Sequence, residues 1–297
     1  MRESGGQIDP NAFRECFTQW TKRVHEKLSG EVISIDGKSI CGSKSKKRRP
    51  IHMISAWVTE QEMVLGQMCV EEKTNEIPTV PLLLELLDIS GCIVTADAMS
   101  CQREIAKKII AGKGDYVLSL KENQPTLHEY AETYFKDALA HPQWYPEMTT
   151  CEIVDKGHGR IEKRTYYLSS DLSGLENAAD WSGFGMVRSH VTMGEVESSE
   201  IRYAITSLNS VEHFAHAWRK HWGIENGLHY CLDVSFNEDH SRIRTDHAPE
   251  NLAVVRHFAL SALKQHPEPK RASIKRKRKI CAYDLDSLSS AVDLILL

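Results

Sequence analysis

Several features that mark common protein classes are missing from these 297 residues. The eight cysteines are scattered and never form a C-x-x-C pair, which argues against a zinc ribbon or a disulfide framework and predicts buried, reduced thiols. No apolar run approaches the ~20 residues that a membrane helix needs, and no signal peptide precedes the first polar residues. We therefore expect a cytoplasmic protein without a membrane partner.

The sequence also lacks a strong excess of charge of either sign. The formal net charge is −4 and the isoelectric point is about 6.4, which argues against a protein that coats nucleic acid non-specifically. Positive charge is nevertheless concentrated in two tracts, residues 44–49 (KSKKRR) and 270–279 (KRASIKRKRK). Such tracts are either solvated surface or sites that neutralise DNA phosphates, with an affinity that falls as salt rises.

The apolar pattern of the first 120 residues predicts an α/β fold. Short β-branched runs indicate strands and apolar spacings of three and four residues indicate helices. Strands are expected over 31–36, 51–58, 63–70, 92–97 and 116–120, and helices over 77–87 and 101–111. A hairpin followed by crossover helices implies a mixed five-stranded sheet flanked by helices.

The rest of the chain adds an N-terminal segment, an insertion within the core and a C-terminal tail. Residues 1–29 predict an N-terminal helical segment, and 30–120 with 211–264 form the core. Residues 121–210 are too many for a connecting loop, and their polar helix near 127–139 and alternating stretches predict a mostly β insertion. Residues 211–232 carry an apolar stripe of helical period, and 265–297 form a basic C-terminal tail.

Three carboxylates stand where a ligand site is expected. Asp36 and Asp97 end short strands, and open α/β sheets bind ligands outside the carboxyl ends of their strands. Glu225 lies on the core-facing helix at 211–232, where a carboxylate is costly unless a cation shares it. Clustered carboxylates repel one another, whereas two Mg²⁺ ions would make all three of them metal ligands. The absence of a persuasive nucleophile–base pair fits metal-assisted chemistry.

Other interpretations of these residues stay open. Each aspartate could instead cap the end of its strand. Glu238 and Asp239, in a charged turn beyond the helix, compete with Glu225 as the third ligand. His221, Glu225 and His229 recur every four residues and could form a zinc stripe on one helix face, although they lack the H-E-x-x-H spacing of a metalloprotease.

A long series of motifs runs in order along nearly the whole chain. The motifs are IDGK (35–38), His52 with Ser55-Ala56, GQ (66–67), EKTNEI (72–77), TADAM (95–99) with Cys101-Gln102, KENQ (121–124), HGR (158–160), HWGIEN (221–226), LDV (232–234) and NED (237–239). This series resembles the H-repeat-associated insertion-sequence transposases, which belong to the DDE class. The resemblance implies a ribonuclease-H-like catalytic core that cuts and rejoins DNA at transposon ends.

The resemblance also implies roles for individual residues. Asp36, Asp97 and Glu225 would be the catalytic residues and would hold two Mg²⁺ ions, with Mn²⁺ as a substitute. The partners would be transposon ends and target DNA, bound by a homodimer at the bacterial nucleoid.

Position and charge predict a further set of side chains that contact DNA. The set is Lys38, Lys121, Asn123, Gln124, His158, Arg160, His221, Arg242 and Arg244. His158 and Arg160 could instead belong to an exposed hairpin turn, and Arg242 and Arg244 could pair with Asp239 and Asp246.

Two departures from the family pattern bear on activity. Many related transposases have an arginine four residues before the glutamate, where this chain has His221. Family members also usually have a longer N-terminal region. The alternatives are therefore a truncated, inactive DNA-binding remnant and a non-specific nuclease of the same fold.

Overall fold

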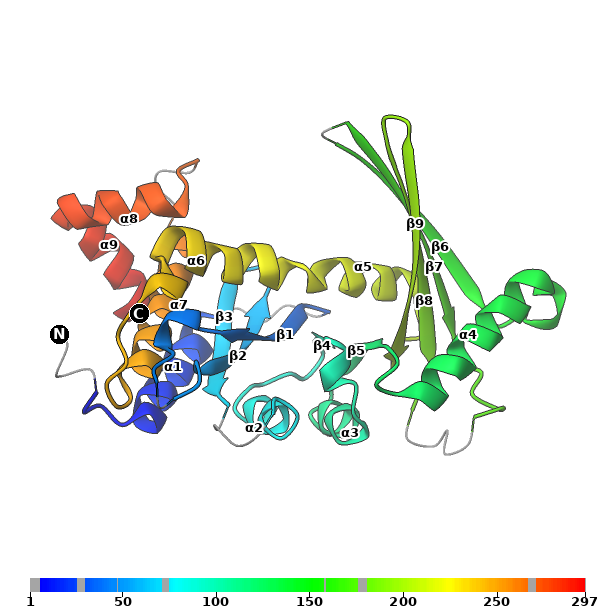
Figure 1. Cartoon of the computed structure of the whole chain (residues 1–297), viewed down its shortest axis with the longest axis horizontal. Helices are drawn as coiled ribbons and strands as arrows, with labels where there is room; N and C mark the ends of the chain where they lie inside the picture. Colours follow the sequence, from blue (N-terminus) through cyan, green and yellow to red (C-terminus); the bar gives the residue numbers. More distant parts are fainter. Residues whose placement is uncertain are drawn as a thin grey trace. The chain divides into compact units, whose positions relative to one another are not determined.

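The protein is described by a computed structural model that covers residues 6–25, 30–46, 48–70, 75–157, 159–175, 181–266 and 271–296. The chain divides into two compact units, Met1–Asp88 with His221–Leu297, and Ile89–Lys220. Both units combine strands with helices (Figure 1). In the described part of the chain, no helix has the length and apolar character to cross a membrane.

The first unit is built on three antiparallel strands in the order β3-β2-β1. They are β1 (Val32–Ser39), β2 (His52–Val58) and β3 (Met63–Cys69). The prediction that β1 ends at Asp36 is wrong, because β1 stays paired with β2 from Ile33 to Ser39. Asp36 therefore lies within the strand, opposite Ser55. The pairing partner, which the sequence does not show, overrides the local turn signal of Asp36-Gly37.

Three helices cover these strands. They are α1 (Pro10–Val24), α2 (Thr79–Glu85) and α7 (Ala248–Gln265). Helix α1 begins at the N-cap Asp9, whose carboxylate accepts the N–H of Asn11. The ring centroids of its Trp20 and of Phe258 on α7 lie 4.5 Å apart. The N-terminal helix is therefore part of the core of this unit.

The residues predicted as a basic C-terminal tail form two helices. They are α8 (Ile274–Tyr283) and α9 (Leu285–Leu296). The buried ammonium of Lys277 on α8 donates to the carbonyls of Leu263 (3.0 Å) and His266 (2.6 Å), at the end of α7. A lysine at this position satisfies carbonyls that have no partner within their helix. Part of the second basic tract therefore stabilises the fold.

The second unit begins with a parallel pair of strands and continues in an antiparallel meander. Strands β4 (Ile93–Ala96) and β5 (Asp115–Leu120) pair in parallel, joined by helix α3 (Arg103–Ala111). Strand β9 (Val196–Thr206) pairs with β5, followed by β8 (Phe184–Met193), β7 (Arg160–Ser169) and β6 (Thr149–Gly157). Helix α4 (Pro125–Ala140) packs on β8 and β9 (Figure 1).

The predicted order of the first five strands and their two helices is confirmed, but the prediction of a five-stranded sheet is wrong. Strands β9, β8, β7 and β6 extend the sheet from the edge of β5, so the sheet of the described residues has nine strands. Pairing with β9 satisfies the N–H and C=O groups that an edge strand would leave open. The chain thus has a mixed α/β structure with a larger sheet than expected.

The cysteines agree only in part with the prediction of buried thiols. All eight are free, as expected. Cys92 and Cys101 are buried, whereas Cys16 and Cys41 are exposed and the others are half-buried.

Candidate active site

The helix predicted over 211–232 is present but contains an irregular turn. Helix α5 (Val211–His221) leads to a π-helical turn, η5 (Glu225–His229), and then to α6 (Tyr230–Phe236). In η5 the N–H of Tyr230 donates to the carbonyl of Glu225, five residues earlier. Such turns are rare and often occur at functional sites. The prediction of one regular helix missed this turn, which includes the candidate glutamate.

Two glycines allow this segment to lie close to β2 and the turn after it. A Cβ atom at Gly227 would lie 2.7 Å from the ring of the buried Trp57. A Cβ atom at Gly223 would collide with the side chain of Thr59. The positions without side chains therefore set how closely Glu225 can approach the strands.

Asp36, Glu225 and His229 come together in the first unit. The Nδ1 atom of His229 lies 3.5 Å from Oδ2 of Asp36 and 3.6 Å from Oε2 of Glu225. One ligand atom from each of these residues lies within 4.8 Å of the others. Asp36 is held in β1, where its Oδ1 accepts the N–H of Gly37. Residues about 190 positions apart in the sequence thus meet at one point.

These three side chains fit a divalent cation. Burial lowers the pKa of His229, although the carboxylate of Glu225 opposes the shift, so the imidazole is neutral at pH 7. A neutral imidazole and two carboxylates form a donor set for a divalent metal ion. The Nε2 atom of His229 is buried and has no hydrogen-bond partner. In the sequence, His229 is a candidate only as part of the zinc stripe, and its i, i+4 spacing from Glu225 is the signal that could have placed it here.

Asp97 belongs to the second unit and lies, as predicted, just after β4. Its Oδ1 accepts the N–H groups of Met99 (3.1 Å) and Ser100 (3.3 Å), so it caps the short 3₁₀ helix η2 (Ala98–Ser100). The amides of Asn123 and Gln124 donate to the carbonyls of Ala98 (2.6 Å) and Cys101 (3.0 Å). These amides hold the loop that carries Asp97, and their predicted contact with DNA stays a prediction. Its approach to Asp36 and Glu225 stays a prediction.

Lys38 was predicted to contact DNA, but it lies in a network of acidic residues. Its Nζ lies 2.8 Å from Asp233, 3.2 Å from Asp239 and 3.6 Å from Glu238. Burial alone would lower the pKa of Lys38, but the hydrogen bond to Asp233 and the charge of Glu238 raise it overall. Lys38 and Asp36 lie on the same face of β1, two residues apart.

The two competitors for the third ligand position belong to this network. Glu238 is 1% exposed and accepts a 3.3 Å hydrogen bond from Arg256. Asp239 accepts the N–H of Cys41 at 3.0 Å. Among the described residues, these carboxylates bind side chains and backbone, whereas Glu225 joins Asp36 and His229.

The other predicted DNA contacts are spread over the chain. Burial lowers the pKa of His221 to about 4, so this side chain is uncharged at pH 7. Arg160 stands at the predicted hairpin turn between β6 and β7 and pairs with Glu162 at 2.6 Å. Arg244 donates to the carbonyl of Gly42 at 3.0 Å. Lys121 and Arg242 are exposed, and His158 lies outside the described residues.

The close contact at Gly227 leads to a prediction on stability. Replacing Gly227 by Ala should lower the free energy of unfolding by about 1–3 kcal/mol, because the new methyl group overlaps the Trp57 ring. Urea denaturation of the purified protein measures this. In Gly157→Ala the new methyl group meets nothing within 4 Å, so this control should stay near the parent. Equal midpoints for the two variants would contradict the close packing of η5.

His257 leads to a prediction on pH. Complete burial lowers its pKa from 6.5 to about 3, with smaller contributions from His229 and Arg256. The unfolded chain therefore takes up the proton first, so unfolding free energy should fall as pH drops from 6.5 towards 3, by at most about 1.4 kcal/mol per pH unit. Denaturation at a series of pH values measures the slope. His257→Leu should flatten it, and an unchanged slope would contradict this origin.

Comparisons with known proteins match most of the sequence to one family. The family described as Transposase DDE domain matches residues 27–262. The chain is 40% identical over 287 residues to the "Putative transposase YncI" of Escherichia coli O157:H7, covering 93% of this chain and 73% of that protein. It is 36% identical over 296 residues to the "H repeat-associated putative transposase YhhI" of Escherichia coli K12, covering 96% of this chain and 77% of that protein.

One solved structure is also similar. It is the cryo-EM structure of the piggyBac transposase synaptic complex with hairpin DNA, with a TM-score of 0.45 and 11% sequence identity. The match covers 90% of this chain and 54% of that one, so this chain spans about half the length of the solved protein.

Proposed function

Because the chain belongs to the transposase DDE-domain family, we propose that it hydrolyses a phosphodiester bond at the end of a mobile DNA element and joins the freed 3′-hydroxyl to target DNA. The observation that carries the proposal is the meeting of Asp36 and Glu225 beside His229. Two carboxylates this close repel each other unless a cation lies between them. Mg²⁺ is the proposed cation and Mn²⁺ its substitute.

The proposed site consists of Asp36, Asp97 and Glu225 in a ribonuclease-H-like core. When bound, the metal ions would stabilise the charge of the reacting phosphate and lower the pKa of an attacking water. The chain's own residues orient the reaction: β1 fixes Asp36, and η5 presents Glu225. The neutral ring of His229 places its Nδ1 beside both carboxylates, where it can add a further ligand to the donor set. Asn123 and Gln124 hold the loop that carries Asp97 through hydrogen bonds to its backbone carbonyls.

The proposed partners are two DNA ends and a target duplex, held by a homodimer at the nucleoid. The exposed Lys121 and Arg242 and the outer lysines and arginines of α8 are the proposed phosphate contacts. Such contacts give an affinity that falls steeply as salt rises.

The test uses the full chain and duplexes that carry the ends of its own element. We expect cleavage at the end of the element in Mg²⁺ or Mn²⁺ but not in EDTA, followed by joined products with a target plasmid. Cleavage of unrelated duplexes at the same rate would instead identify a non-specific nuclease. Binding without cleavage in any divalent metal would identify an inactive DNA-binding remnant.

A further inference from the structure

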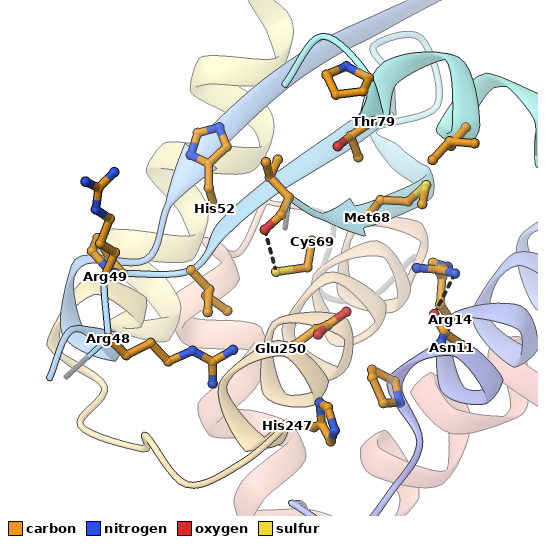
Figure 2. A pocket seen from close by; sticks show the side chains of 16 residues that line it. Asn11, Arg14, Arg48, Arg49, His52, Met68, Cys69, Thr79, His247 and Glu250 are labelled. Atoms are coloured by element: carbon orange, nitrogen blue, oxygen red, sulfur yellow. Dashed lines mark hydrogen bonds between the residues drawn. The ribbon is translucent and has the colours of Figure 1, made fainter. Parts of the chain in front are cut away.

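The first unit contains a cavity of about 570 Å³ apart from Asp36, Glu225 and His229. It lies among the start of α1, the chain before β2, the end of β3, and the starts of α2 and α7 (Figure 2). Its arginine, histidine and glutamate side chains are Arg14, Arg48, Arg49, His52, His247 and Glu250. None of the catalytic roles proposed above uses these residues.

Arginine dominates the charge of this cavity. Three arginines and one glutamate line it, so the arginine charges outnumber the carboxylate charge by two. The guanidinium of Arg14 donates to the side chain of Asn11 at 2.9 Å, and that of Arg48 to the carbonyl of Asp246 at 3.1 Å. A guanidinium has five N–H donors in a planar fork, so it can hold such an uncharged acceptor and a phosphate together.

Glu250 lies between the arginines. Figure 2 shows its carboxylate in the cavity, with Arg48 on one side and Arg14 on the other. Burial raises the pKa of Glu250, and the charges of Arg14, His247 and Arg48 oppose this shift. Its negative charge partly offsets the field that the arginines create for an anion, so removing that charge should strengthen anion binding.

The walls of the cavity are aliphatic. Among the described residues that line it there is no tryptophan, tyrosine or phenylalanine. Proline, isoleucine, methionine, valine and leucine side chains surround the charged groups instead. Without these larger rings, a base could stack only on the small imidazole rings of His52 and His247 and would gain less stacking energy. The chemistry therefore favours a sugar–phosphate unit over a base.

We propose that this cavity binds a backbone phosphate of a DNA strand, as an anchoring contact separate from the Asp36, Glu225 and His229 cluster. The choice of DNA as the source of the phosphate rests on the proposed function. Contacts of this kind position a duplex and carry no sequence information. Binding at the cavity is thus independent of divalent metal and of the sequence of the duplex.

The test measures fluorescence anisotropy of the full chain with an end-labelled 20-base-pair duplex of arbitrary sequence in EDTA, over a salt series. We expect Arg14→Ala and Arg48→Ala to weaken binding about five- to tenfold and to reduce the salt slope by about 1. Glu250→Gln should tighten binding. Arg23→Ala removes the same charge from an exposed position on α1 outside the cavity, and should change affinity less than twofold.

Three outcomes would overturn the proposal. One is equal affinity of the Arg14→Ala and Arg23→Ala variants. Another is an unchanged affinity in Glu250→Gln, a variant that keeps the size of the side chain. The third is a cavity that binds only a free nucleotide. In that case Arg14→Ala would abolish the binding of thymidine monophosphate measured by calorimetry and would leave duplex binding unchanged.

Failure of the proposed function looks different. A chain that does not cleave its element ends, but whose duplex binding still responds to Arg14→Ala and Glu250→Gln, retains the anchoring site and lacks the transposase activity.

Discussion

Replacing Glu225 by Gln is expected to reduce metal-dependent cleavage of the element's end by about a thousandfold, or about 4 kcal/mol in the activation free energy. The amide keeps the size of the side chain but removes the negative charge that faces Asp36 and His229 across the proposed metal site. Glu225 is 54% exposed, so its replacement should leave the free energy of unfolding nearly unchanged. Single-turnover cleavage assays and urea denaturation measure the two effects.

The matched control is Glu212→Gln, an exposed glutamate in the first turn of α5. It should cleave like the parent. Binding of Mn²⁺, followed by calorimetry, should weaken in Glu225→Gln and not in the control. If Glu225→Gln kept full cleavage, Glu225 would not be a metal ligand and the proposed site would be wrong.

Glu238 should have the largest effect on stability. Replacing it by Ala is expected to lower the free energy of unfolding by about 3–5 kcal/mol, because Arg256 would stay buried without its anionic partner. Burial raises the pKa of Glu238 while Arg256 and Lys38 lower it, so burying this carboxylate already has a cost. The cationic side chains of Arg256 and Lys38, each beside one oxygen of the carboxylate, offset that cost.

Two further variants test this explanation. The double variant Glu238→Met with Arg256→Met removes both charges and should recover most of the lost stability. Glu152→Ala breaks an exposed 2.7 Å ion pair with Lys163 and should cost less than about 1 kcal/mol. If the double variant were less stable than Glu238→Ala, the loss would come from side-chain packing rather than from an unpaired charge.

Hydrophobic periodicity predicted most of the helices and strands. The order of the first five strands and the helices between them follow from patterns within short segments, as do the alternating stretches at 151–154, 160–168, 186–191 and 201–205. The location of Asp97 after β4 could be predicted for the same reason. The extension of the sheet by β9 to β6 could not be predicted, because hydrogen bonding of β5 to β9 joins residues about 85 positions apart.

The functions of individual polar and charged residues were harder to predict. Lys38, Asn123 and Gln124 have side chains suited to DNA, yet each binds groups of its own unit. A sequence shows which groups are available and does not show which partners are nearby. The π-helical turn η5 is a similar case, since Gly223 and Gly227 acquire their role only against Thr59 and Trp57.

By itself, the sequence determined the family, the order of the secondary structure and the identity of the candidate carboxylates, because these depend on motifs and on local periodicity. Tertiary structure alone decided that Asp36 meets Glu225 and His229, that Glu238 is buried against Arg256, and that Arg14, Arg48 and Arg49 line one cavity. These contacts join segments far apart in the chain. Their distances come from packing and strand pairing, which no local pattern of residues encodes.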